Sequence, residues 1–229
     1  MQDPQAVPTI EALRQTMVDC QLRTFDITNR EVLAAALEVP REVFVPGVAA
    51  AVVYSDRMLD IPGGQGRAMP APMIVARLLQ AADLKPQDKV LVVSSGTGYT
   101  AALVSRLAGT VVALDSEAAL TAAATANFAR IGAGNVQAVT GALADGVAAQ
   151  APYDVIIVDG ALEAEPEALF GQLGEGGRLY AVVLPEGAAG WRGKATVFEK
   201  NSGRIGSRTL FDAAAKPLDA FRRKAVFSF

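Results

Sequence analysis

Apolar residues near the start of the chain recur at helical spacing. Between residues 9 and 40, positions such as Met17 and Val32 fall on the apolar stripe expected of amphipathic helices. Thr28 is the predicted cap of the second helix, and Pro40 is its predicted end. The opening of the chain is therefore predicted to be helical.

The next stretch, residues 45–72, is rich in Pro and Gly but is punctuated by apolar residues. That pattern is typical of an ordered loop and not of a flexible linker. A loop of this length inside a compact domain usually has a functional role.

From residue 73 onward, short apolar runs alternate with helical patterns. The predicted strands are 90–93, 111–114, 136–140, 153–158 and 178–183, and the predicted helices are 73–82, 100–108, 118–131 and 166–173. This alternation predicts an α/β fold whose mainly parallel sheet has helices on both faces. Two further runs, 194–200 and 203–211, predict a hairpin around Asn201-Ser202-Gly203. Residues 224–229 are predicted to form a last strand.

The segment Val90 to Tyr99, VLVVSSGTGY, combines a buried strand, a turn rich in Ser and Gly, and the start of a helix. Such a turn brings backbone N–H groups against a nucleotide-like ligand. Asp115 ends the next strand about 20 residues later, where a carboxylate can accept hydrogen bonds from ribose hydroxyls. Its alternative role is to cap the following helix. Together the turn and Asp115 predict a nucleoside site.

Composition argues against a secreted, membrane-spanning or nucleic-acid-binding protein. The chain has 229 residues, a net charge of −3 and a single Cys. That length buries a full core without disulfides or metals, and the lone Cys20 agrees with a reducing, cytoplasmic compartment. The basic start of a secretory signal is missing, and no apolar run approaches the ~18 residues of a membrane span. We expect no nucleic-acid partner, although Arg222, Arg223 and Lys224 form a short basic run that we interpret as a solvated face.

Histidine is absent from the sequence. This excludes Ser-His-Asp and Cys-His triads, and, with a single Cys, it excludes the usual zinc sites. We therefore expect no metal site. Histidine is the commonest general base, so a reaction in its absence favours a nucleophile that is already ionised at neutral pH. A carboxylate that accepts a methyl group is such a nucleophile.

Four segments together resemble the protein-L-isoaspartate O-methyltransferase family over nearly the whole chain. They are residues 17–22 with 32–46 (MVDCQL and VLAAALEVPREVFVP), 62–76, 90–99, and 153–178 (YDVIIVDGA and LGEGGR). The resemblance implies a Rossmann-like class I methyltransferase fold with a seven-stranded sheet, preceded by an N-terminal helical segment. It also implies S-adenosylmethionine as donor and repair of isoaspartyl residues in damaged proteins or peptides.

The cofactor residues of such proteins align with positions that have changed here. The acidic residue expected at the end of the first strand is Val92, and the first glycine of the turn is Ser94. The acidic residue expected to face the adenine is Ala142, followed by Leu143. These replacements make S-adenosylmethionine binding doubtful, and Ser94 would either crowd the ligand or offer it a hydroxyl.

The substrate loop has changed as well. It aligns here with residues 66–72, where Pro70 stands at the position of the family's serine beside the reacting centre, and Ala68 at that of its threonine. No catalytic residue is therefore assigned. Arg67 is interpreted either as a partner for a substrate carboxylate or as an exposed loop arginine.

These considerations define the candidate site and the domain boundaries. The cofactor-site candidates are Ser94, Ser95, Gly96, Thr97, Gly98, Asp115, Ala142, Leu143 and Asp159, and the substrate-loop candidates are Arg67, Met69 and Pro70. Asp159 has a second interpretation as a turn-forming residue before Gly160. Residues 1–75 are predicted to form the helical segment and substrate-side loop, and residues 76–229 the methyltransferase domain.

The sequence leaves more than one function open. The first is an active methyltransferase on isoaspartyl carboxylates, as a monomer or homodimer, and the second is a catalytically impaired homologue that serves as a binding or regulatory module. A nicotinamide oxidoreductase is disfavoured, because the turn lacks the GxGxxG spacing.

Overall fold

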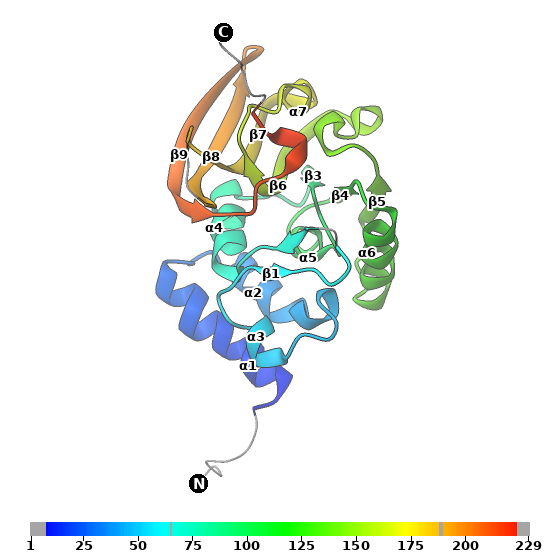
Figure 1. Ribbon diagram of the computed structural model, residues 1–229, viewed down its shortest axis with the longest axis vertical. Helices are drawn as coiled ribbons and strands as arrows, with labels where there is room; N and C mark the ends of the chain where they lie inside the picture. The colour runs from blue at the N-terminus through cyan, green and yellow to red at the C-terminus, as the bar shows by residue number, and fades with distance from the viewer. Residues whose placement is uncertain (1–7, 65, 188–189, 224–229) are drawn as a thin grey trace.

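The structure, a computed structural model, describes residues 8–64, 66–187 and 190–223 (Figure 1). The predicted strand at 224–229 lies outside them. The helices are α1 (Ile10–Met17), α2 (Arg30–Glu38), α3 (Ala50–Val53), α4 (Pro72–Ala82), α5 (Tyr99–Val104), α6 (Ala118–Arg130) and α7 (Glu167–Gly171). The strands are β1 (Leu59–Asp60), β2 (Ala68–Met69), β3 (Lys89–Val93), β4 (Thr110–Asp115), β5 (Val136–Thr140), β6 (Tyr153–Leu162), β7 (Leu173–Val183), β8 (Arg192–Asn201) and β9 (Arg204–Ala214).

The main sheet has seven strands in the order β5-β4-β3-β6-β7-β8-β9. Strands β3 to β7 pair in parallel, whereas β7, β8 and β9 pair antiparallel. The predicted parallel sheet and the predicted hairpin are both confirmed. The order reverses direction between β4-β3 and β6, which is where open α/β sheets bind ligands, outside the carboxyl ends of their strands.

Alternate residues of each strand face opposite sides of the sheet, and two separate apolar clusters result. Val90 and Val92 of β3 join the larger cluster, which includes side chains of α2, α4, α5 and α6. Leu91 and Val93 join the smaller cluster with residues of α7 and of the short 3-10 helix η6 (Asp219–Phe221). Helices thus cover both faces, as the buried apolar strands require.

The N-terminal helices gather at one end of the molecule, and the β8–β9 hairpin lies at the opposite end (Figure 1). After α1 come a π-helical turn, η1 (Val18–Leu22), and short 3-10 helices, η2 (Arg23–Phe25) and η3 (Arg41–Phe44). The cap of α2 differs from the prediction. Asn29, and not Thr28, accepts hydrogen bonds from the backbone N–H groups of Glu31 and Val32, because it stands directly before the first helical residue, Arg30.

The predicted loop 45–72 is ordered by a short helix, α3, and by the antiparallel pair of β1 and β2. Leu59 pairs with Met69, and Asp60 pairs with Ala68. This pairing brings the residues between β1 and β2 over the carboxyl end of the main sheet. No helix in the described ranges is long and apolar enough to cross a bilayer.

Candidate functional site

The turn between β3 and α5 has the conformation that its glycines require. Gly96 and Gly98 both have positive φ, +55° and +102°. A Cβ at Gly96 would collide with the side chain of Ile61, and one at Gly98 with the ring of Phe128. Only glycine fits either position.

Ser94 also has positive φ, +62°, although it carries a side chain. Its hydroxyl and that of Ser95 are buried and have no hydrogen-bond partner among the described residues. Thr97 differs from them, because its hydroxyl donates to the backbone carbonyl of Phe44 at 2.6 Å. The turn therefore offers free hydroxyls at Ser94 and Ser95, and uses the one at Thr97 to hold the N-terminal segment.

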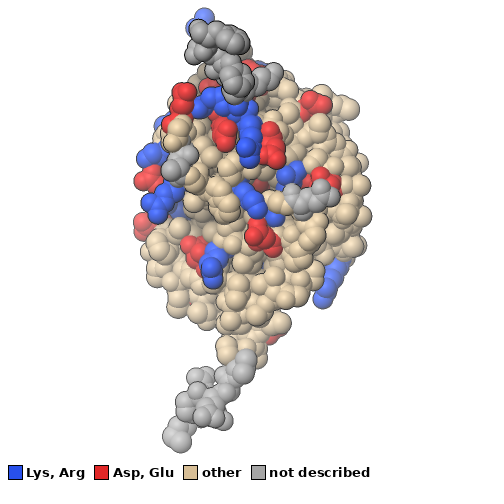
Figure 2. Space-filling view, in the orientation of Figure 1, with Lys and Arg blue, Asp and Glu red and all other residues tan. Residues whose placement is uncertain are grey.

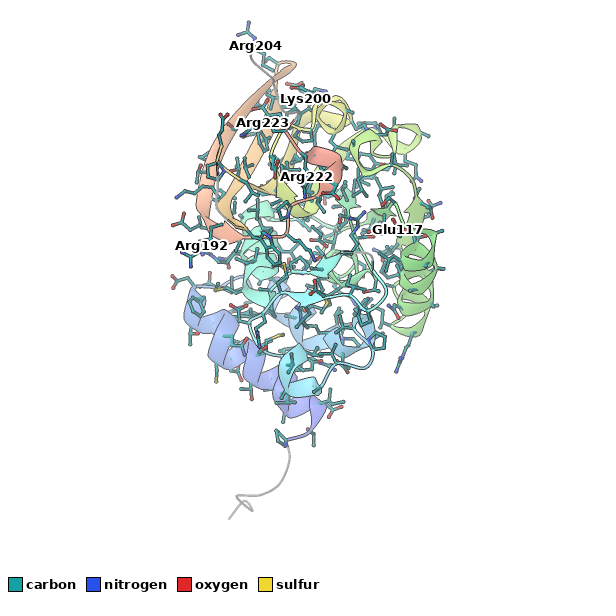
Figure 3. The ribbon with its side chains drawn as sticks, viewed as in Figure 1. Glu117, Arg192, Lys200, Arg204, Arg222 and Arg223 are labelled. Carbon is teal, nitrogen blue, oxygen red and sulfur yellow. The ribbon has the colours of Figure 1, made fainter. Side chains whose placement is uncertain are left out.

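Asp115 ends β4 and faces this turn. Its fully buried carboxylate accepts hydrogen bonds from the backbone N–H of Gly96 at 2.9 Å and from that of Glu117 at 3.2 Å. Glu117 lies at the start of α6 (Figure 3). Asp115 therefore binds the backbone next to the helix that follows, as its alternative role required, and its place at the turn leaves the ribose role a prediction.

Arg67 forms an ion pair with Asp115. Its Nε lies 3.3 Å from each carboxylate oxygen, and its Nη2 donates to the hydroxyl of Ser116 at 2.7 Å. The side chain of Arg67 is only 16% exposed. The arginine is therefore neither a free loop residue nor available to a substrate in this conformation, because a carboxylate of the protein already holds it.

Asp159 lies on the other side of the turn, in β6 next to the end of β3. Burial raises the pKa of its carboxyl to about 7, with a smaller contribution from Asp115, while Thr100 and Arg41 act to lower it. The predicted turn at Asp159 is absent, because β6 continues through a register irregularity and pairs again with β7.

Arg41, which the sequence reasoning did not single out, is fully buried behind the substrate loop. Its Nη2 donates to the carbonyl of Pro70 at 2.7 Å, its Nε donates to that of Val53 at 3.0 Å, and its guanidinium lies 4.6 Å from the ring centre of Tyr99. Burial lowers the pKa of this arginine. The sequence signal that could have identified Arg41 was its place in the VPRE segment, which carries the family resemblance.

Of the remaining candidates, Met69 lines a small hollow together with Ser95 and Thr97 of the turn. Met69 is buried in the larger core cluster, and Leu143 in the smaller one. Ala142 follows Gly141, whose backbone N–H donates to the carbonyl of Asp115 at 3.0 Å. The structure thus brings together Ser94, Ser95, Gly96, Asp115, Asp159 and the substrate loop with Met69, whereas the side chain of Leu143 serves packing.

Two hollows adjoin this site and share Met58. The smaller, between the substrate loop, Ser94 and Asp159, has a volume of only about 10 Å³. The larger, about 760 Å³, lies between the start of α4 and the start of β8, and Arg192 lines it. Its size is that of an ordinary ligand cleft. Figure 2 shows acidic and basic side chains interspersed on one face of the molecule, with no large area of one sign.

The sequence and fold were compared with known proteins. The family model described as "Protein-L-isoaspartate(D-aspartate) O-methyltransferase (PCMT)" matches residues 13–214. A protein-L-isoaspartate O-methyltransferase of Koribacter versatilis is 42% identical over 205 residues, which are 90% of each chain. One from Methanoculleus marisnigri is 39% identical over 172 residues, 75% of this chain and 77% of the other.

Solved structures agree with this match. A protein-L-isoaspartate O-methyltransferase superposes with a TM-score of 0.80 and 27% identity, over 90% of this chain and 65% of that longer chain. A Plasmodium falciparum structure in complex with S-adenosyl-L-homocysteine superposes with a TM-score of 0.73 and 19% identity, over 93% and 100% of the two chains, and supports the fold. The expected Rossmann-like class I methyltransferase fold is confirmed, and the chain belongs to the protein-L-isoaspartate (D-aspartate) O-methyltransferase family.

Proposed function

We propose that the protein is an S-adenosylmethionine-dependent methyltransferase that acts on isoaspartyl carboxylates of damaged proteins or peptides. The family match over residues 13–214 carries this proposal. The convergence of Asp115 and the Gly96 turn at the carboxyl end of the sheet supports it. Nothing favours the impaired alternative over this function.

The residues at the turn fit a nucleoside cofactor chemically. Asp115 offers a carboxylate to ribose hydroxyls, and the buried hydroxyls of Ser94 and Ser95 lack partners among the described residues. Space is the obstacle, because Ile61 covers Gly96 and Arg67 covers Asp115. The cofactor therefore fits once these side chains move, and Ser94 and Ser95 would help to hold it despite the replacements at Val92 and Ala142.

The proposed methyl transfer requires no general acid or base from the protein. S-adenosylmethionine supplies an electrophilic methyl group, and the acceptor carboxylate is already ionised at neutral pH. The chain's residues therefore act by positioning and by excluding water. Arg41 fixes the loop through the carbonyl of Pro70, and the buried Met69 on the same loop keeps this side of the site apolar.

The larger cleft is the proposed entry for the damaged polypeptide. It shares Met58 with the small hollow beside Asp159, so a peptide lying in it would be next to the proposed reacting centre. Arg192, at the start of β8, lies at this side of the molecule (Figure 3). The cleft is also lined by Asp56, Lys194 and Asp212, so both signs of charge face a bound polypeptide.

Titration of the protein with S-adenosyl-L-homocysteine, followed by methylation of an isoaspartyl peptide, tests the proposal. We expect binding in the micromolar range and methylation of the isoaspartyl peptide but not of its aspartyl counterpart. Asp115→Asn retains an acceptor for the Gly96 N–H while it removes the charge, and should weaken binding by roughly 10- to 100-fold. No binding at millimolar ligand would refute the proposal.

Several finer expectations remain predictions. They are the domain division at residue 75, the monomeric or homodimeric state, and the cytoplasmic location. Cys20 is exposed, which agrees with a reducing compartment.

A further inference from the structure

The segment between β1 and β2 covers the nucleoside site with two side chains. Ile61 lies against Gly96, where the backbone of the turn would otherwise face a ligand. Arg67 lies on Asp115 and binds both of its oxygens through Nε. The adjoining hollow has a volume of about 10 Å³, far below the volume of a nucleoside.

The hydrogen bonds of Asp115 are already distributed within the protein. The backbone N–H groups of Gly96 and Glu117 bind it from one side, and Arg67 binds it from the loop side. The two N–H groups belong to fixed backbone at the turn and at the start of α6. Arg67 is the partner that a ligand can displace, because it is a side chain on a loop.

Backbone hydrogen bonds link Ile61, Gly64 and Arg67, so that these residues can move together. The N–H of Ile61 donates to the carbonyl of Arg67 at 3.0 Å, and the N–H of Arg67 donates to the carbonyl of Gly64 at 2.7 Å. The β1–β2 pairing joins its two ends to each other, and a 2.9 Å ion pair between Asp60 and Lys216 ties it to the chain beyond β9. Displacement of Arg67 would carry Ile61 away from Gly96.

We propose that Arg67 determines the affinity of the cofactor site by competing with the ribose hydroxyls for Asp115. A ligand with a ribose must first break the Arg67 bonds to Asp115 and Ser116, so the pair lowers the observed affinity. The inference rests on the proposed function, because it takes Asp115 as the ribose acceptor. The fork of the Arg67 guanidinium spans Asp115 and Ser116 together, which a point charge would not do.

Calorimetric titration of S-adenosyl-L-homocysteine into wild type, Arg67→Ala and Arg67→Lys tests the competition. We expect Arg67→Ala to bind about tenfold more tightly or better. Arg67→Lys should fall between the two, because a lysine pairs as a point charge and does not span both partners. Arg222→Ala is the matched control, since Arg222 pairs with Asp219, both side chains are exposed, and its loss should leave the affinity unchanged.

A second pair of ligands makes the test specific for the ribose hydroxyls. Adenosine should gain affinity in Arg67→Ala, whereas 2′,3′-dideoxyadenosine should not, because it has no hydroxyls to offer Asp115. Equal or weaker binding of S-adenosyl-L-homocysteine by Arg67→Ala than by wild type would overturn the inference and leave the proposed function intact.

Hydrogen exchange tests, without any ligand, whether the loss of the Arg67 side chain loosens the loop. The amides of Ile61, Gly64 and Arg67 should be protected in wild type and should exchange faster in Arg67→Ala. Faster exchange without binding by either protein would show that the segment opens but that Asp115 accepts no ribose. That result would overturn both proposals, whereas unchanged exchange would overturn the inference alone.

Discussion

At the residue scale, Asp159 is the most perturbed carboxyl of the site. It is 7% exposed, and burial dominates the shift that raises its pKa to about 7. An unfolded aspartate loses its proton near pH 3.9. Between these values the folded protein therefore binds a proton that the unfolded chain does not.

This linkage predicts a pH dependence of stability. The free energy of unfolding of wild type should fall as the pH rises from 5 to 8, relative to that of Asp159→Asn, by at most about 3 kcal/mol. The protonated Asp159 carboxyl contributes its full stabilisation below pH 4, and this stabilisation is lost as the pH rises through about 7. Urea denaturation of both proteins across this range measures the difference, and parallel curves would contradict the prediction.

The sequence identified several residues of the site but not their partners. Asp115 and Ser94 were found because a strand end and a glycine turn leave a local pattern. Ile61 and the pairing of Arg67 with Asp115 were missed, because these contacts join residues far apart in the chain. The position of Arg67 depends on the register between β1 and β2, two short strands with no periodic signal.

At the element scale, the β3–α5 turn contains a side chain in a left-handed conformation. Ser94 has φ +62°, a region that costs an L-residue roughly 1–2 kcal/mol. Its buried hydroxyl has no partner among the described residues. The turn is therefore less stable than one with glycine at this position.

Replacement of Ser94 by glycine should stabilise the protein by about 1 kcal/mol or more, which raises Tm by roughly 2–4 °C for a chain of this size. Ser202→Gly is the matched control, because Ser202 has φ +52° in the exposed β8–β9 turn. We expect the smaller gain there, since its hydroxyl is hydrated. Thermal unfolding measures both, and a destabilised Ser94→Gly would mean that the hydroxyl makes a bond that stabilises the fold.

Most elements were predictable, because buried parallel strands read as apolar runs between helices. The end of β6 was not, since Asp159-Gly160 has the composition of a turn. The strand nevertheless continues to Leu162, where pairing with Val183 of β7 outweighs the local preference.

At the scale of the whole molecule, the N-terminal helices and the sheet share one apolar core. The larger cluster extends from Met17 of α1 to Ala215 beyond β9. Thr97 of the glycine turn also donates to the carbonyl of Phe44 in η3. Such shared burial couples the stability of the two parts.

We therefore expect a single unfolding transition. The fluorescence of Trp191, the chain's one tryptophan, reports on the start of β8, and far-UV circular dichroism reports on the helices. Their urea transitions should coincide. Met17→Ala should lower the free energy of unfolding that both probes report by about 2–5 kcal/mol, because Met17 is fully buried. Ile10→Ala, on the exposed face of α1, should have little effect. Two separate transitions would contradict this coupling.

The bonds of Asp115 also bear on how such a site changes during evolution. This carboxylate orders the glycine turn through Gly96 and the start of α6 through Glu117. Selection for folding alone would retain it in a descendant that had lost its ligand. The hydroxyls of Ser94 and Ser95 have no such structural partner in the described part of the chain. In a lineage of such proteins, substitutions at these serines would therefore follow the ligand, and Asp115 would follow the fold.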